Sequence, residues 1–140
     1  MKKSAFTLIE LIIVIGIISL GLAIVSLRFN IVDEIGAKNE IKTFVNDYNY
    51  ARDMALSSGT TQYIKFEDNS YSLVGKINIK RNFKYVKCNN TKEIKINDNA
   101  YVVIDKEKEA HNLKFTSKKN PDKKWTLGIE AVGGYINEKS

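Results

Sequence analysis

Glu10 is the only charged residue in an apolar run that extends from Phe6 to Leu27 near the start of the chain. As a helix this run would be roughly 33 Å long, about the thickness of the hydrocarbon core of a bilayer. A carboxylate at that depth costs on the order of several kcal/mol unless a cation compensates it, so such carboxylates usually pair. The chemistry to expect of Glu10 is therefore an ion pair.

Two clusters of basic residues are the next candidates for binding chemistry. The first is interleaved with Phe83 and Tyr85, and the second flanks Pro121 next to Trp125. Their members are Lys76, Lys80, Arg81, Lys84 and Lys87 in the first, and Lys118, Lys119, Lys123 and Lys124 in the second. Basic residues with nearby aromatics suit the backbone of a nucleic acid. A lysine-rich solvated loop is the alternative, since Asp122 lies inside the second cluster and a net charge of +6 permits anionic partners without establishing them.

The remaining candidates for metal or covalent chemistry are few. Asp105, Glu107 and Glu109 alternate with lysines and predict a charged turn, in which the lysines would compete with calcium for the carboxylates. His111 and Cys88 are the only residues of their types, which excludes a His/Cys metal cluster and an intrachain disulfide. We expect a half-buried Cys88 and a solvated or packed His111. Without a nucleophile–base motif, we expect no enzyme, no cofactor and no metal.

The apolar run that positions Glu10 allows three interpretations. Lys2 and Lys3 precede it, which places the N-terminus in the cytoplasm and the body of the chain outside. A secretory signal peptide would have a shorter apolar core and a small-x-small cleavage site. A plain membrane anchor leaves Glu10 and the order of its neighbours unexplained. That order, "AFTLIEL" at residues 5–11 directly before a membrane-length helix, favours the third interpretation.

This arrangement closely resembles the class III signal of type IV prepilins and pseudopilins. In that family a membrane aspartyl peptidase cuts on the cytoplasmic side, and the apolar helix stays on the mature protein. The resemblance implies a cut between Ala5 and Phe6, removal of a leader at residues 1–5, and methylation of the new Phe6 amine by the same enzyme. The family usually has glycine before the cut, where this chain has Ala5.

The resemblance also implies a partner for Glu10. The amine created on Phe6 would lie four residues before Glu10, on the same face of the helix. In the family the amine belongs to a neighbouring subunit of the filament, while pairing across one turn of a single chain is the alternative that the sequence leaves open. Small residues recur along this helix at spacings of three and four: Gly16, Ser19, Ala23 and Ser26. They would allow close helix–helix approach, although ordinary membrane-helix composition explains them equally well.

From about residue 31 to 58 the apolar residues follow a single stripe of an otherwise polar helix. The members of this stripe are Ile35, Ile41, Phe44, Val45, Tyr48, Ala51, Ala55 and Leu56. Gly59 is suited to a left-handed cap at the end of the helix. Many family members carry a proline near the position of Leu27, which this chain lacks, so Gly36 is the residue that could soften the helix. We therefore predict one helix from Phe6 to Ser58, roughly 80 Å long.

After this helix the pattern shortens to strands. We predict strands at residues 63–66, 71–74, 77–79, 83–86, 94–96, 101–104, 113–115, 125–129 and 135–136. Their spacing implies an antiparallel sheet, in which the apolar run 101–104 would be a central strand. The predicted fold is α+β and type IV pilin-like, with the long helix packed on one face of the sheet. Residues 6–29 would form the membrane or filament-core segment and residues 30–140 the globular domain.

Two further segments resemble the GspH/FimT-like pseudopilins and minor pilins. In residues 46–73 the resemblance lies in Ala51–Arg52 near the end of the helix and in the turn at 57–59. At residues 127–136, "LGIEAVGGYI" is similar to the closing hairpin of that family. A competence-type pseudopilin is a close rival.

The resemblance implies a structural subunit, a minor pilin or pseudopilin, of a type IV pilus-like, type II secretion or competence filament. Its partners would be other pilins, the prepilin peptidase and the inner-membrane assembly platform. Before assembly it would be a single-pass membrane protein with an extracytoplasmic C-terminal domain, and afterwards part of a cell-surface or periplasmic filament. A DNA-binding minor pilin that acts in DNA uptake is the alternative function.

Overall fold

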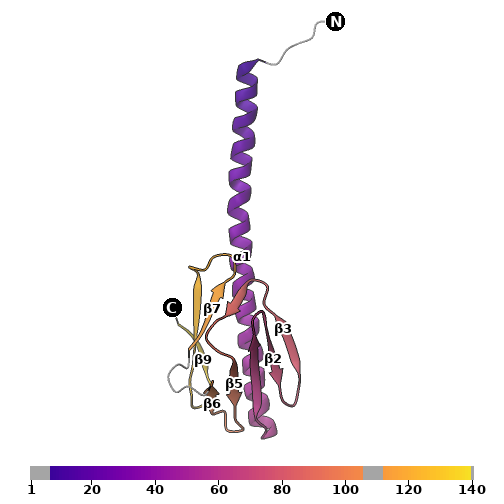
Figure 1. Cartoon of the computed structure of the whole chain (residues 1–140), viewed down its shortest axis with the longest axis vertical. Helices are drawn as coiled ribbons and strands as arrows, with labels where there is room; N and C mark the ends of the chain where they lie inside the picture. Colours follow the sequence, from indigo (N-terminus) through magenta and orange to yellow (C-terminus); the bar gives the residue numbers. More distant parts are fainter. Residues whose placement is uncertain (1–6, 106–111, 140) are drawn as a thin grey trace.

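A single long helix dominates the architecture. The computed structural model describes residues 7–105 and 112–139, and the side chains within these ranges except those of 25–30 and 139. Helix α1 (Leu8–Ser58) contains 51 residues and is therefore roughly 76 Å long. One end projects well beyond the strands, and the other end lies against them (Figure 1). The predicted continuity is confirmed over these residues, while the predicted start at Phe6 lies outside them.

The C-terminal end and the middle of α1 depend on two glycines. Gly59 has φ of 61°, which confirms the predicted left-handed cap. The helix is unbroken at Gly36, and softening of the helix by this residue stays a prediction. A Cβ at Gly36 would lie 2.6 Å from Cε2 of Tyr85, which is closer than atoms can approach. Glycine is thus needed here for close packing against the Tyr85 ring.

The strands form two antiparallel sheets where one was predicted. The first consists of β1 (Gln62–Glu67), β2 (Ser70–Val74), β3 (Ile79–Asn82), β5 (Glu93–Ile96) and β6 (Val102–Ile104), in the order β3-β2-β1-β5-β6. The second consists of β4 (Val86–Cys88), β7 (Asn112–Ser117), β8 (Lys124–Ile129) and β9 (Ile136–Lys139), in the order β4-β7-β8-β9. In the first sheet, Ile64 lies opposite both Leu73 and Ile94, which places apolar side chains on one face.

Strand β6 was predicted to be central and is instead at the edge of the first sheet. The apolar run at 101–104 suggested burial on both faces, but Tyr101 and Val103 are 44% and 39% exposed. Only Val102 and Ile104 face the core. Other strand boundaries also differ from prediction: β3 begins at Ile79, residues 83–85 precede β4 without belonging to a strand, and β9 extends from Ile136 to Lys139.

The core lies where α1 meets both sheets. Five predicted members of the helical stripe are buried there: Ile41, Phe44, Tyr48, Ala51 and Ala55. The Phe44 ring lies 5.2 Å from that of Tyr71 in the first sheet and 5.3 Å from that of Phe115 in the second. Ile35 and Leu56 were assigned to the same stripe, but they are 55% and 46% exposed because they lie at its margins. The helix therefore joins the two sheets through one aromatic cluster.

Two polar ties fix α1 to the sheets. The Asp47 carboxylate accepts hydrogen bonds from the Tyr71 hydroxyl at 2.6 Å and from Nε of Arg81 at 2.5 Å. Burial and the hydrogen bond to Asp47 raise the pKa of Tyr71, so its hydroxyl stays protonated and donates. In the turn between β8 and β9 of the other sheet, the carbonyl oxygen of Gly134 accepts a hydrogen bond from the Tyr48 hydroxyl at 2.9 Å. These ties hold the apolar face of the helix in one rotation against the sheets.

Candidate assembly site along helix α1

Thr7 and Glu10 form the described N-terminus of the helix. Thr7 has extended backbone geometry, and its Oγ1 accepts a hydrogen bond from the backbone N–H of Glu10 at 3.4 Å. A threonine followed three residues later by glutamate is the sequence pattern of a capping box. The negative charge of Glu10 also lies next to the partial positive charge of the helix end. The T-x-x-E signal for this role is present in the sequence, and it was not used in the prediction.

The predicted processing site lies outside the described residues. Both Ala5 and Phe6 belong to that part of the chain, and so does the amine that cleavage would create. Glu10 is exposed, and among the described residues no side chain pairs with its carboxylate. Pairing of Glu10 with the Phe6 amine therefore stays a prediction.

The N-terminal part of α1 exposes apolar side chains on every side. The described large ones between residues 8 and 24 are Leu8, Ile9, Leu11, Ile12, Ile13, Val14, Ile15, Ile17, Ile18, Leu20, Leu22 and Ile24, with exposed fractions from 43% to 77%. A helix that is apolar all round belongs in the interior of a protein assembly or in a membrane. Among the described residues, the strands lie along the opposite end of α1 and do not cover this segment (Figure 1).

Within the described part of the chain, no helix combines the length and the hydropathy that crossing a membrane requires. Gly16 and Ser19 of the predicted stripe lie on the open surface of the same segment. A Cβ built on Gly16 would meet no other heavy atom within 4 Å. The Ser19 hydroxyl donates to the carbonyl oxygen of Ile15 at 2.8 Å, so it is satisfied within the helix. At Gly16 and Ser19 the helix surface therefore has room for a close neighbour.

Ion pairs surround the point where α1 meets the second sheet. The Lys119 ammonium lies 2.6 Å from the Asp33 carboxylate, and Lys123 pairs with Glu34. Lys38 lies 3.3 Å from Glu34, one turn along the helix. Hydrogen bonds from Lys123 and then Lys38 lower the pKa of the Glu34 carboxyl below its usual value. The turn between β7 and β8 is thereby linked to the helix.

Glu40 organises the segment that leads into β4. One carboxylate oxygen accepts the backbone N–H of Lys84 at 2.7 Å, and the other accepts those of Tyr85 and Val86 at 2.9 and 3.1 Å. These bonds replace the sheet ladder for residues 84 and 85, which is why the strand predicted over 83–86 starts only at its last residue. No local sequence signal identifies this role, because the partners are far apart in the chain.

The structure does not bring the predicted basic clusters together as free cationic surfaces. Most members have partners inside the chain. In the first cluster, Lys80 lies 2.8 Å from Glu67, and Arg81 forms an ion pair with Asp47. The Lys84 ammonium lies 5.1 Å from the centre of the Tyr85 ring. In the second cluster, Lys118 donates to the Phe83 carbonyl oxygen, and Lys119 and Lys123 pair with carboxylates of α1. Lys76, Lys87 and Lys124 are exposed and have no ion-pair partner among the described residues.

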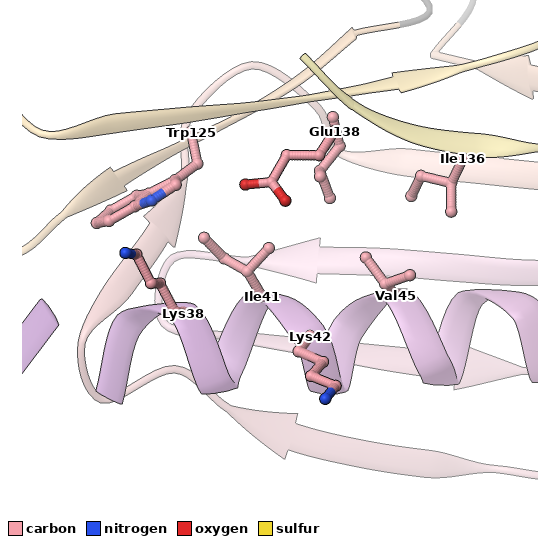
Figure 2. A pocket seen from close by; sticks show the side chains of 8 residues that line it. Lys38, Ile41, Lys42, Val45, Trp125, Ile136 and Glu138 are labelled. Carbon is pink, nitrogen blue, oxygen red and sulfur yellow. The ribbon is translucent and has the colours of Figure 1, made fainter. Parts of the chain in front are cut away.

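A groove of about 470 Å³ runs between α1 and the strands β8 and β9. Its lining is mostly apolar and consists of Lys38, Ile41, Lys42, Val45, Trp125, Leu127, Ile136 and Glu138. Figure 2 shows the Glu138 carboxylate directed toward the space between Trp125 and Ile41, whereas Lys42 points away from it. The lining residues include no nucleophile–base pair. The groove was not predicted, because it depends on how two distant segments pack.

The other candidate residues have structural surroundings. Asp105 accepts the backbone N–H groups of Lys92 and Glu93 at 3.0 and 2.8 Å, so it serves as a cap for β5. The neighbouring candidates at 107, 109 and 111 lie outside the described residues. Among the described residues, no group of three His, Cys, Asp or Glu side chains is arranged to hold a metal ion. Cys88 is half-buried as predicted, and burial raises the pKa of its thiol to about 11.

The comparisons with known proteins identify the N-terminal segment. Residues 1–26 match the model of the prokaryotic N-terminal methylation motif. No curated protein and no solved structure matches the chain. The motif and the α+β architecture together define a type IV pilin-like protein. The motif implies a membrane-anchored prepilin, processing by prepilin peptidase and assembly into a filament, and pilin-like proteins are generally structural subunits without enzymatic activity.

Proposed function

We propose that this chain is a minor pilin or pseudopilin, cut between Ala5 and Phe6, methylated on the Phe6 amine and assembled through α1 into a filament. The observation that carries the proposal is the exposed apolar surface of residues 8–24 beside a head that is already well packed. Covering a leucine or isoleucine contributes about 1.5–3 kcal/mol, so many such side chains give assembly a large driving force.

Each part of the chain has a step in this proposal. Residues 1–5 are the leader that the peptidase removes on the cytoplasmic side. Residues 6–29 hold the subunit in the inner membrane and then enter the filament core, with the assembly platform as the partner during transfer. Residues 30–140 form the extracytoplasmic head, which ends on a cell-surface or periplasmic filament. Glu10 pairs with the Phe6 amine of a neighbouring subunit.

Within this class, we favour a GspH/FimT-like subunit. Ala51 is buried in the core, and Nε of Arg52 donates to the Gly133 carbonyl oxygen at 2.5 Å. The Arg52 guanidinium also lies 4.4 Å from the centre of the Tyr135 ring. The two segments that carry the subfamily resemblance thus hold one another in place. A pilus, a type II secretion pseudopilus and a competence pseudopilus all remain compatible with these contacts, and the neighbouring genes would identify the system.

The processing step is tested by the intact mass of the protein purified from membranes of cells with an active prepilin peptidase. We expect a chain that starts at Phe6 and carries one N-methyl group. The same chain from cells without the peptidase should retain residues 1–5. A mature chain that starts at Met1 in peptidase-positive cells would contradict the proposal.

The assembly step is tested with Glu10→Gln, which keeps the shape of the side chain and removes its charge. We expect the variant to be processed and to accumulate in the membrane, and to be lost from sheared filaments by at least about tenfold. Glu67→Gln is the matched control, since it removes one exposed carboxylate from the head. Equal amounts of Glu10→Gln and parent protein in filaments would show that the carboxylate is dispensable.

A further inference from the structure

Ion pairs fix the turn between β7 and β8 close to the end of the apolar segment of α1. Lys119 of this turn lies 2.6 Å from the Asp33 carboxylate, and Lys123 pairs with Glu34. Asp33 comes six residues after Leu27, the last residue of the apolar run, so it lies roughly 9 Å further along the helix. The turn is therefore at the end of the head from which the apolar segment projects (Figure 1).

The segment before β4 reaches α1 at nearly the same level. The Tyr85 ring packs against Gly36, where an added Cβ would lie 2.6 Å from Cε2 of the ring. The backbone N–H of Lys118 donates to the Tyr85 carbonyl oxygen at 2.9 Å, and the Lys84 ammonium lies 5.1 Å from the centre of the Tyr85 ring. These contacts gather four residues around α1, which we call the collar: Lys84, Tyr85, Lys118 and Lys119.

The collar keeps positive charge that the chain does not compensate. The neighbouring carboxylates of α1 are engaged within the chain: Asp33 and Glu34 in ion pairs, and Glu40 with backbone N–H groups. Lys84 and Lys118 are exposed and have no ion-pair partner among the described residues. Asp122 is the only acidic residue in the turn at 118–123. The ammonium groups of the collar therefore remain available to an anion from another molecule.

Exposed aliphatic side chains lie at the same level of α1. Ile31, Val32 and Ile35 are each more than half exposed, although they are beyond the apolar run. They share this end of the head with the Tyr85 ring and the lysines of the collar. Aliphatic, tyrosine and lysine side chains in this combination are typical of the boundary between the hydrocarbon core of a bilayer and its headgroups.

The position of the collar along α1 also matches this boundary. The headgroup layer extends about 5–7 Å beyond the hydrocarbon core on each side of a bilayer. With Leu27 at the edge of the hydrocarbon, the level of Asp33 is just outside this layer. Flexible lysine stems can reach back from there to the lipid phosphates. Anionic phospholipids are the better partners, because a zwitterionic headgroup carries its own cation.

We propose that the collar binds the phosphates of anionic phospholipids on the extracytoplasmic face of the membrane that holds the apolar segment. The inference rests on the proposed function, since it requires this segment of α1 to be inserted. It adds a lipid-binding surface on the head, separate from the contacts of α1 with neighbouring subunits. Contact with lipid holds the head against the membrane before assembly.

The test uses the full chain reconstituted in vesicles of phosphatidylcholine, with or without about one-third phosphatidylglycerol. Acetylation by an uncharged, water-soluble reagent, followed by peptide mass spectrometry, measures the reaction rate of each lysine. We expect Lys84 and Lys118 to react at least about threefold more slowly with phosphatidylglycerol present, and high salt to remove the difference. Lys76 is the internal control, because it is exposed, unpaired among the described residues and next to Gln62 at the far end of the head. Its rate should be the same in both kinds of vesicle.

A set of variants separates specific charge from net charge. Replacement of both Lys84 and Lys118 by Gln should reduce the phosphatidylglycerol retained by the full chain in non-ionic detergent at least about twofold, as measured by native mass spectrometry. Replacement of the same two residues by Arg keeps the charge and should keep the retained lipid. The matched control replaces Lys65 and Lys76 by Gln, which removes the same charge from other surfaces and should leave the retained lipid unchanged. Unchanged circular dichroism checks that all variants are folded.

The outcomes separate this inference from the filament proposal. Equal rates at Lys84 and Lys118 in the two kinds of vesicle, with the chain inserted, would overturn the lipid contact and leave the filament proposal standing. Equal slowing at Lys76, or equal loss of lipid in the two Gln pairs, would also overturn it, because general surface charge would then explain the result. Extraction of the chain from the vesicles by alkaline carbonate would show that it is not inserted. That result would overturn both the lipid contact and the membrane step of the proposed function.

Discussion

The N-terminal and C-terminal parts of α1 belong to one uninterrupted helix, but they differ in how their apolar side chains are covered. Between residues 8 and 24, large apolar side chains are exposed on every side. Between residues 31 and 58, one face is buried and the rest of the helix is polar or marginal, with Phe44, Tyr48 and Ala55 fully covered. The backbone geometry is the same, so the difference comes from the distribution of side chains around the helix.

This difference separates folding from assembly within one element. The stripe of the C-terminal part is satisfied inside the chain by two sheets, which makes the head stable as a single subunit. The N-terminal part stays exposed among the described residues, so folding of the head does not bury it, and in our proposal a membrane or neighbouring subunits cover it. Substitutions in the two parts should therefore give different readouts, and pairs of matched substitutions test this separation.

The largest contrast is expected between Phe44→Ala and Ile17→Ala. Phe44 is fully buried and touches rings from both sheets, so truncation should lower the free energy of unfolding of the head by about 3–5 kcal/mol. Ile17 is 65% exposed and its truncation should leave thermal unfolding of the head unchanged. Thermal and denaturant unfolding of the full chain in non-ionic detergent measures both. A comparable loss in the two variants would show that the whole helix folds as one unit with the head.

Two of the glutamates of α1, Glu10 and Glu40, offer a second contrast. Glu40→Ala removes the acceptor of three backbone N–H groups and should destabilise the head by about 2 kcal/mol, with the segment 84–86 losing protection against hydrogen exchange. Glu10→Gln should leave both measurements unchanged and should act only on filament incorporation. Full protection of the 84–86 amides in Glu40→Ala would mean that the carboxylate is not what holds this segment.

The sequence predicted what depends on local order in the chain. The helix, its cap at Gly59 and the buried residues Phe44 and Tyr48 follow from a periodicity that is visible within a few residues. Division of the strands into two sheets, and the edge position of β6, depend on pairings between distant segments that no local pattern encodes. Residues 101–104 were wrongly predicted to form a central strand. A continuous apolar run is typical of a strand buried on both faces, but one face of β6 is exposed.

Candidate sites divide in the same way. The N-terminal motif was predicted because its residues are contiguous, and the match to residues 1–26 supports it. The basic clusters were grouped by proximity in sequence, but ion pairs with residues up to 89 positions away neutralise several members. Strand register places Lys87, Lys114 and Lys124 on one side of the second sheet, a neighbourhood that becomes visible only in the folded chain.

A smaller effect is expected at the glycines of α1. Alanine normally stabilises a helix interior by about 1 kcal/mol relative to glycine. At Gly36 the added Cβ would meet the Tyr85 ring at 2.6 Å, so Gly36→Ala should destabilise the head by about 1 kcal/mol despite the helix preference. At Gly21 nothing lies within 4 Å, and Gly21→Ala should not lower the melting temperature of the head. A melting temperature raised by Gly36→Ala would mean that Tyr85 moves aside freely.

The smallest effect concerns pH and the junction between the two parts of α1. The pKa of Glu34 is lowered in the folded chain, chiefly by its hydrogen bond with Lys123. A lowered carboxyl pKa stabilises the fold above the pKa of the unfolded chain, about 4.3, and this stabilisation is lost as the pH falls through the folded value. Lys123→Gln should therefore lower the melting temperature slightly at pH 7, and the difference from the parent should shrink below about pH 4.

Lys42→Gln is the control for this measurement, because Lys42 is an exposed lysine of the same region without an ion-pair partner among the described residues. It removes the same charge and should give a melting-temperature difference that does not depend on pH in this range. Because Lys38 still pairs with Glu34 at 3.3 Å, Lys123→Gln should remove only part of the acid sensitivity. A pH-independent difference for Lys123→Gln would place its contribution in packing of the turn and not in the ion pair, and the junction would then be held in the same way as the rest of the head.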